Sequence, residues 1–166
     1  MVFMTQTSNP FTALAHSTRI AVVCSSWHKD IVDQARLALF EEFERHGLPN
    51  ESLDLFELPG AFEIPLHALK LARSGRYQAI IACGLVVDGG IYRHDFVAAA
   101  VIDGLMRVQL DTGVPVFSSV LTPHQFHEHD EHRRYFAAHF AVKEREVAQA
   151  CMQTLVASAA LDALIN

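Results

Sequence analysis

Apolar and polar residues alternate along the chain in blocks that predict strands and helices in turn. Four short runs are rich in apolar, often β-branched residues, as buried parallel strands are. They are RIAVVCSS from Arg19, SLDLFELP from Ser52, YQAIIACGLVV from Tyr77 and VPVFSSVLT from Val114. Apolar residues at helical spacing follow the first three runs and predict helices over residues 30–47, 63–75 and 95–113.

The last strand is followed by two helical stretches, residues 127–140 and 142–165, with a break expected near Ala141. Regular alternation of strand and helix predicts an α/β fold with a parallel sheet and helices on both of its faces. We expect one domain over residues 18–166, preceded by an extended arm over residues 1–17.

Ligands of such folds bind at the carboxyl ends of the strands. Four segments should therefore meet at one edge of the sheet and hold any functional site. They are residues 25–28, 59–63, 85–97 and 118–124.

Composition narrows the class of protein. Apolar residues make up 51% of the chain and charged residues 19%, which is typical of a globular protein. The net charge of −6 disfavours a nucleic-acid partner. The chain has no run of ~18 consecutive apolar residues, so we expect no membrane partner. In a soluble protein, so high an apolar content suggests that part of the apolar surface is buried against further copies of the chain.

Cysteine usage and the first residues bear on location. Cys24 and Cys83 lie inside apolar runs and predict buried core thiols, while Cys151 lies far from both. An odd number of cysteines without a disulfide pattern favours a reducing cytoplasm. The N-terminal stretch lacks a basic region and a long apolar run, so we do not expect a signal peptide.

The stretch LVVDGGIYRHDFV, from Leu85, carries the most specific chemistry. Gly89 and Gly90 precede a helix, where exposed N–H groups and the helix dipole favour an anion. Arg93 adds a two-pronged donor for phosphate or carboxylate, and His94 can move a proton near neutral pH. Asp95 is expected to cap the helix. A turn needs neither Arg93 nor His94 for its geometry.

Two other loops carry weaker signals with structural alternatives. Trp27, the only tryptophan, follows the first strand and either stacks on a planar heterocycle or covers the sheet edge. In PGAFEIP, Gly60 permits close backbone approach. Glu63 either binds a ligand or interacts with the start of the following helix.

Histidines are concentrated in HQFHEHDEHRR, at positions 124, 127, 129 and 132. Glu128 lies one helical turn from both His124 and His132, a spacing that can hold zinc. The HExxH spacing of zinc hydrolases is absent. We favour a solvated helix that contributes one anion-binding side chain, and we expect no metal.

Together, the motifs ELPGAFEIP, GLVVDGGIYRHDFV and DTGVPVFSSVLT resemble 6,7-dimethyl-8-ribityllumazine synthase. The resemblance runs from about Ile20 into the last helix. It implies a three-layer α/β/α sandwich, flavodoxin-like, with a four-stranded parallel sheet. The implied enzyme is a transferase of riboflavin biosynthesis. It would condense 5-amino-6-(D-ribitylamino)uracil with L-3,4-dihydroxy-2-butanone 4-phosphate, without metal or organic cofactor.

The resemblance also implies site residues, each at the position of a matching family residue. Catalytic roles fall to Arg93 and His94. Substrate-binding roles fall to Trp27, Ala61, Phe62, Glu63, Leu85, Val86, Val87, Gly90, Ile91, Ser118, and His132 or Arg133. Ser118 stands where an aromatic residue of the neighbouring subunit usually lies, so the resemblance implies a site shared within a pentamer.

Three departures from the family pattern are visible. Arg93 stands where family members have their catalytic histidine, and His94 follows one residue later. The family's phosphate-binding arginine aligns with either His132 or Arg133. The glycine-rich loop before the last helix is replaced by YFAAHFAVKERE, from Tyr135, a pattern that resembles the type II branch of decamers built from two pentamers.

Two rival functions remain open at this level. One is a flavin- or lumazine-binding paralogue with little catalysis, suggested by Arg93 in place of histidine and by Trp27. The other is a zinc hydrolase that uses the histidines of the helical stretch after the last strand. Product formation, quenching of Trp27 fluorescence and metal analysis distinguish the three.

Overall fold

The computed structural model describes residues 11–13, 16–87, 90, 93–123 and 130–166, with the side chains of Asp130 and His132 excepted. Strands and helices alternate in the predicted order. The strands are β1 (Ile20–Ser25), β2 (Leu53–Leu58), β3 (Ala79–Leu85) and β4 (Val116–Leu121). The helices are α1 (Lys29–Arg45), α2 (Ile64–Arg73), α3 (His94–Thr112) and α4 (Asp130–Ile165).

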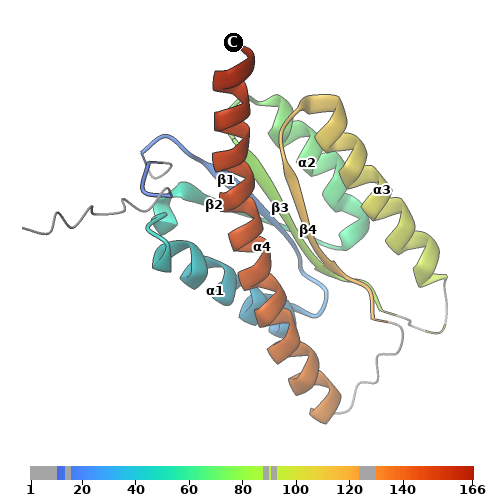
Figure 1. The fold of residues 1–166 in the computed structure, drawn as a ribbon. Coiled ribbons are helices and arrows are strands. Elements are labelled where there is room, and N and C mark those ends of the chain that lie inside the picture. Colours follow the sequence, from blue (N-terminus) through green and yellow to red (C-terminus); the bar gives the residue numbers. More distant parts are fainter. Residues whose placement is uncertain (1–10, 14–15, 88–89, 91–92, 124–129) are drawn as a thin grey trace, which may run out of the picture.

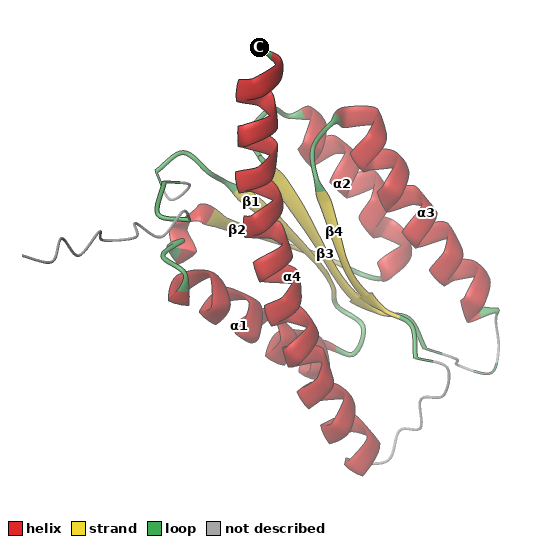
Figure 2. Ribbon diagram, viewed as in Figure 1, coloured by secondary structure: helices red, strands yellow, loops and turns green. Residues whose placement is uncertain are grey.

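The sheet is parallel throughout, with strand order β2-β1-β3-β4. Helices α1 and α4 cover one face, and α2 and α3 cover the other (Figures 1 and 2). This confirms the predicted α/β class and the three-layer, flavodoxin-like architecture. Because β1 and β3 are central and buried on both faces, they consist almost entirely of apolar residues.

Alternation along β1 divides the core into two layers. Ile20, Val22 and Cys24 pack towards α1 and α4, whereas Ala21 and Val23 pack towards α2 and α3. Both faces of the central strands are therefore buried among apolar side chains. The predicted burial of Cys24 is confirmed, with 3% of its surface exposed. One carboxyl group of α4 is buried against this core, beside Ser119 of β4.

Two predictions about helices are wrong. The last helix runs from Asp130 to Ile165 without a break near Ala141, because packing against α1 and the sheet continues across that point through Phe140 and Ala148. Asp95 does not cap α3. The capping position belongs to Arg93, whose carbonyl accepts the amides of Phe96 and Val97 at 3.0 and 3.4 Å.

The buried carboxyl group is Glu144 of α4, which has no exposed surface. It accepts hydrogen bonds from the Ser119 hydroxyl of β4 and, at 3.8 Å, from the Cys83 thiol of β3. Burial raises the pKa of Glu144 to about 7, against the lowering effect of these two donors. The pKa of Cys83 is also raised, first through its hydrogen bond with Cys24 and then by burial.

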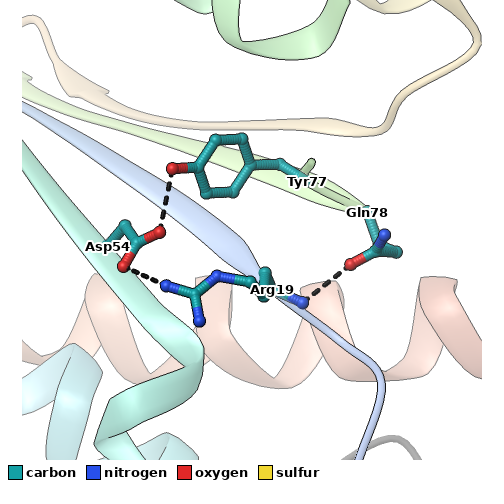
Figure 3. Close-up of polar contacts among 4 residues, drawn as sticks. All are labelled: Arg19, Asp54, Tyr77 and Gln78. Atoms are coloured by element: carbon teal, nitrogen blue, oxygen red, sulfur yellow. Dashed lines mark hydrogen bonds and ion pairs between the residues drawn. The ribbon is translucent and has the colours of Figure 1, made fainter. Parts of the chain in front are cut away.

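At the amino-terminal edge of the sheet, a polar cluster ties three strands together (Figure 3). Arg19 donates from Nη2 to Asp54 Oδ1 at 2.5 Å, and the Tyr77 hydroxyl donates to Asp54 Oδ2 at 2.8 Å. The amide of Arg19 also donates to the Gln78 side chain at 2.7 Å. These contacts fix the starts of β1, β2 and β3 relative to one another, at the end opposite the predicted ligand site.

Within α4, the segment Arg133–Ile165 is long and apolar enough to cross a membrane by length and composition, a test that core helices of globular proteins also pass. Its inner face packs in the core through Ala148, Cys151 and Met152. Near its C-terminal end, Leu161 and Leu164 are exposed.

Candidate functional site

Backbone hydrogen bonds bring the predicted loops together at the carboxyl edge of the sheet. The amide of Ser26, after β1, donates to the carbonyl of Leu58 at the end of β2, at 2.7 Å. The amide of Val86, after β3, donates to the carbonyl of Leu121 at the end of β4, at 2.9 Å. The four strand ends therefore form one continuous edge, as parallel topology requires.

A cavity of about 260 Å³ opens at this edge. Six residues line it, and five of them were predicted from the sequence. They are Trp27, Ala61, Phe62, Leu85, Val86 and Val97. The wall is mostly apolar and suits a planar ring. Val97 was not predicted, although its position one helical turn after Arg93 in the same motif could have indicated it.

Trp27 is held at the mouth of this cavity by a strained turn. Its neighbour His28 has a left-handed backbone, with φ of 56°, and is the only described non-glycine residue with positive φ. The carbonyl of His28 then accepts the amides of Ile31 and Val32 as α1 begins. Left-handed backbone in a non-glycine residue is often found at functional sites. Here it places an indole that is 60% exposed beside an apolar cavity.

Gly60 lies directly beneath the indole. A Cβ atom at this position would lie 3.1 Å from Trp27 Cζ3 and 3.0 Å from Glu63 Oε2. The predicted close approach is therefore made by a side chain of the protein itself. The amide of Gly60 donates to Glu63 Oε2 at 3.0 Å, so Glu63 closes the turn before α2.

The first turn of α3 carries the charged part of the edge. Arg93 donates from Nε and Nη2 to the two oxygens of Asp95, at 3.1 and 2.9 Å. The same guanidinium lies over the Phe96 ring, with Cζ 4.3 Å from the ring centroid. Asp95 raises the pKa of Arg93, and the hydrogen bonds from Arg93 lower the pKa of Asp95. Arg93 is thus a permanent cation at the start of a helix, where the dipole also favours anions.

Preceding this turn, Gly90 has φ of 72°, a left-handed conformation that favours glycine. Val87 is half-buried at the end of β3, and His94, half-buried, is the first residue of α3. The predicted site residue Ile91 lies outside the described residues, as do Gly89 of the predicted anion turn and the histidines at positions 124, 127 and 129.

Two predicted residues lie away from the cavity within this chain. Arg133 of α4 donates from Nη2 to Asp30 Oδ2 of α1 at 2.6 Å, and this hydrogen bond lowers the pKa of Asp30. Asp30 and Arg133 line a separate cavity of about 400 Å³. Ser118 is exposed on β4, an edge strand of the sheet. His132 lies in α4, with its side chain outside the described set.

The described part of the chain contains no group of three or more histidine, cysteine, aspartate or glutamate residues that could hold a metal ion. Three of the four histidines on which the zinc hypothesis depends lie outside that part. The arrangement that the described residues do form is an apolar cavity at the strand ends, with the cation Arg93 at the start of the neighbouring helix.

These features define an α/β protein with a candidate ligand site at the carboxyl edge of a parallel sheet, where the exposed indole of Trp27 lines an apolar cavity and Arg93 precedes a helix. The sequence model of the 6,7-dimethyl-8-ribityllumazine synthase family matches residues 17–159. The chain belongs to this family, which confirms the resemblance seen in its motifs.

Similar proteins carry the same name. The chain is 62% identical over 143 residues to 6,7-dimethyl-8-ribityllumazine synthase of Rhodococcus erythropolis, covering 86% of this chain and 92% of the relative. It is 57% identical over 142 residues to 6,7-dimethyl-8-ribityllumazine synthase 2 of Bradyrhizobium diazoefficiens, covering 86% and 85%. A third relative, 6,7-dimethyl-8-ribityllumazine synthase 2 of Pseudomonas syringae pv. tomato, is 54% identical over 137 residues, covering 82% and 81%.

Proposed function

We propose that this protein is a lumazine synthase of riboflavin biosynthesis. It condenses 5-amino-6-(D-ribitylamino)uracil with L-3,4-dihydroxy-2-butanone 4-phosphate to give 6,7-dimethyl-8-ribityllumazine. The observation that carries the proposal is the apolar cavity between Trp27, Ala61 and Val86, which suits a pyrimidine ring and is also lined by Val97, one helical turn after the cation Arg93. Family membership and the names of the relatives support the same reaction.

The reaction proceeds in three stages. The aromatic amine of the uracil attacks the ketone and forms a Schiff base with loss of water. Inorganic phosphate is then eliminated. The remaining amine closes the second ring with loss of a second water. Holding both substrates in contact supplies much of the rate, because it converts a bimolecular reaction into an effectively unimolecular one.

The uracil ring lies in the cavity in this proposal. Trp27 stacks on the ring, while the backbone from Leu85 to Val87 binds its edge. Ala61 and Phe62 bind the ribityl chain. Glu63 does so as well, and it exchanges its present hydrogen bond from Gly60 for one from the ligand.

The phosphate lies at the start of α3. Gly90 and Ile91 supply backbone N–H groups, and Arg93 supplies charge. Because Asp95 raises the already high pKa of Arg93, this guanidinium cannot release a proton in the reaction. We therefore assign electrostatic stabilisation of the departing phosphate to Arg93 and proton transfer to His94.

We also propose that the protein works as an oligomer, a pentamer or a decamer of two pentamers. An apolar stripe on the outer face of α3 supports this, because Ile102, Met106 and Leu110 recur every four residues and all three are exposed. Ser118 and Arg133 lie away from the cavity within one chain. We assign them, with His132, to the site of the adjacent copy. A cytoplasmic location fits the three free cysteines.

The direct test mixes both substrates with purified protein and follows formation of the lumazine by its absorbance. We expect turnover between about pH 6 and pH 8, the range in which a histidine exchanges protons. Arg93→Ala should reduce the rate or the affinity for the phosphate substrate. A folded protein without turnover at any pH in this range would overturn the proposal, and an unchanged Arg93→Ala variant would remove Arg93 from the site.

The second candidate function is binding of a flavin or lumazine with little catalysis. The exposed Trp27 beside an apolar cavity favours it. In that case riboflavin would bind tightly and quench the tryptophan emission, while the mixture of both substrates would give no product. Unchanged emission on addition of riboflavin would show that Trp27 does not stack on the ligand ring, and this would remove the main support for this candidate.

A further inference from the structure

Asp95 and Phe96 hold the Arg93 guanidinium from two directions. The carboxylate of Asp95 accepts the Nε–H and one Nη2–H, at 3.1 and 2.9 Å. The ring of Phe96 covers one face of the guanidinium, with Cζ 4.3 Å from its centroid. Arg93 is the N-cap of α3, and Asp95 and Phe96 lie in its first turn, where the amides of Phe96 and Val97 donate to the Arg93 carbonyl. The side chain is therefore oriented by the helix that it starts.

This geometry uses one edge of the guanidinium and leaves a second edge for a ligand. A guanidinium carries five N–H groups, and Asp95 takes the pair on the Nε–Nη2 edge. Both N–H groups of Nη1 and one of Nη2 are not donated to Asp95. Nη1 and Nη2 together form the fork that matches two oxygens of a phosphate.

Arg93 is linked to the cavity wall through the start of α3, since the amide of Val97 donates to the Arg93 carbonyl. Val97, which lines the cavity with Trp27, lies one helical turn after Arg93 on α3. A phosphate bound at the start of the helix would therefore lie near both Arg93 and a ring bound in the cavity. An exposed arginine without fixed neighbours would sample many rotamers. A carboxylate and a ring that restrict its rotamers therefore set the orientation in which the guanidinium contacts a ligand.

We propose that Asp95 and Phe96 are positioning residues that present the Nη1–Nη2 edge of Arg93 to the phosphate of the substrate. This inference rests on the proposed function and adds two residues that the sequence left out of the site. The opposite role for Asp95 is competition, in which its carboxylate occupies the guanidinium and must be displaced by phosphate. The two roles predict opposite changes in phosphate affinity when Asp95 is substituted: positioning predicts weaker binding, and competition predicts tighter binding.

Asp95→Asn removes the charge and one acceptor but keeps the size of the side chain. If Asp95 positions Arg93, the KM for the phosphate substrate and the Ki of inorganic phosphate should both rise by about two- to fivefold, the range expected for an exposed charged pair. The KM for the uracil substrate should not change. Asp95→Glu should restore part of the affinity, and Phe96→Leu should raise the same two constants.

Asp103→Asn is the matched control, because Asp103 is an exposed aspartate of the same helix. It should leave every constant unchanged. Unchanged or lower KM and Ki values in Asp95→Asn would overturn the inference, and lower values would establish competition instead. Circular dichroism confirms that each variant is folded.

The outcome separates this inference from the proposed function. Wild-type protein that forms product while Asp95→Asn keeps its phosphate constants contradicts only the positioning role. Wild-type protein that forms no product contradicts the proposed function. Titration calorimetry with inorganic phosphate then still measures whether Asp95 changes anion binding, and an unchanged affinity in Asp95→Asn overturns the positioning role.

Discussion

Glu144 of α4 accepts a hydrogen bond from Ser119 of β4 in the interior of the protein, where the Glu144 side chain has no exposed surface. The contact joins the longest helix to an edge strand of the sheet. A carboxyl group in this position is stable only while it stays protonated or fully hydrogen-bonded. Its titration should therefore be visible in the stability of the whole fold.

We expect the free energy of unfolding to fall as pH rises through the range in which Glu144 titrates. Burial raises its pKa from an ordinary value of 4.5 to about 7, so the unfolded chain loses this proton first. The contribution of Glu144 to the free energy of unfolding is constant below about pH 4.5. It decreases by about 3 kcal/mol between there and about pH 7 and then levels off. Urea unfolding at about pH 5 and about pH 8 measures it.

Glu144→Gln keeps the shape of the side chain and cannot ionise, so its stability should lack this decrease. Glu146→Gln is the control, because Glu146 lies on the same helix, paired with Lys143 at 2.7 Å near the surface. An equally steep decrease in Glu144→Gln and wild type would assign the pH dependence to other groups.

Tyr77→Phe should destabilise the amino-terminal edge of the sheet by about 1 kcal/mol, the usual net contribution of one hydrogen bond. The substitution removes the donor to Asp54 Oδ2 and leaves Arg19 as the partner of that carboxylate (Figure 3). Thermal unfolding measures the change. Tyr135→Phe, at an exposed position of α4, should have no effect.

The same cluster has a pH dependence of opposite sign to that of Glu144. The hydrogen bond from Arg19 is the main cause that lowers the pKa of Asp54. The stability from this carboxylate is therefore present above its ordinary pKa of 3.8 and is lost as pH falls through the lower folded value. Asp54→Asn should reduce the loss of stability as pH falls below about 4. A loss as steep as that of the wild type would contradict this role.

Gly60→Ala should damage the ligand site without unfolding the protein. The added methyl group would lie 3.1 Å from the indole of Trp27 and 3.0 Å from Glu63 Oε2, so both side chains must move. We expect a shift in tryptophan emission and about tenfold weaker binding of a pyrimidine or flavin ligand, as for loss of one good stacking contact. Fluorescence titration measures both.

Gly75→Ala is the control for this prediction. Its Cβ would meet nothing within 4 Å, although its φ of 71° makes the substitution strained as well. It should cost stability but leave the emission of Trp27 and the affinity unchanged. Equal emission and affinity in Gly60→Ala and wild type would mean that Trp27 is not held by Gly60 when a ligand binds.

Met106→Glu should weaken self-association. Met106 lies in the centre of the exposed α3 stripe, between Ile102 and Leu110, and a carboxylate buried there would be desolvated without a partner. We expect association to weaken by at least about tenfold, or about 1.4 kcal/mol. Sedimentation velocity measures the distribution of species. Ala157→Glu, at an exposed position of α4, is the control, and an undisturbed assembly in Met106→Glu would place the interface elsewhere.

Much of the fold was predictable because its signals are local. The apolar β-branched runs of β1 and β3 mark strands buried on both faces, and Gly113, with φ of 71°, ends α3 where it was expected. The prediction of a break near Ala141 was wrong because no local signal shows that Phe140 and Ala148 both pack against α1 and the same face of the sheet. Asp95 has the residue type of a helix cap, yet its side chain binds Arg93 instead.

The candidate site was predictable in part for the same reason. Trp27, Ala61, Phe62, Leu85 and Val86 come together because parallel topology gathers strand ends at one edge. Val97 was missed, although its position one helical turn after Arg93 could have indicated it, because the packing of α3 alone shows which of its apolar residues line the cavity. The pairing of Arg133 with Asp30 joins residues 103 positions apart and has no local signal.

By itself, the sequence determined the order of strands and helices, the family and the residue types available at the carboxyl edge, because periodicity and motifs depend on neighbours along the chain. Only the tertiary structure decided the strand order β2-β1-β3-β4, the burial of Glu144 against Ser119 and the edge of Arg93 that Asp95 occupies. Those features depend on which distant segments pack together and on which rotamers their packing permits, and neither can be read from local spacing.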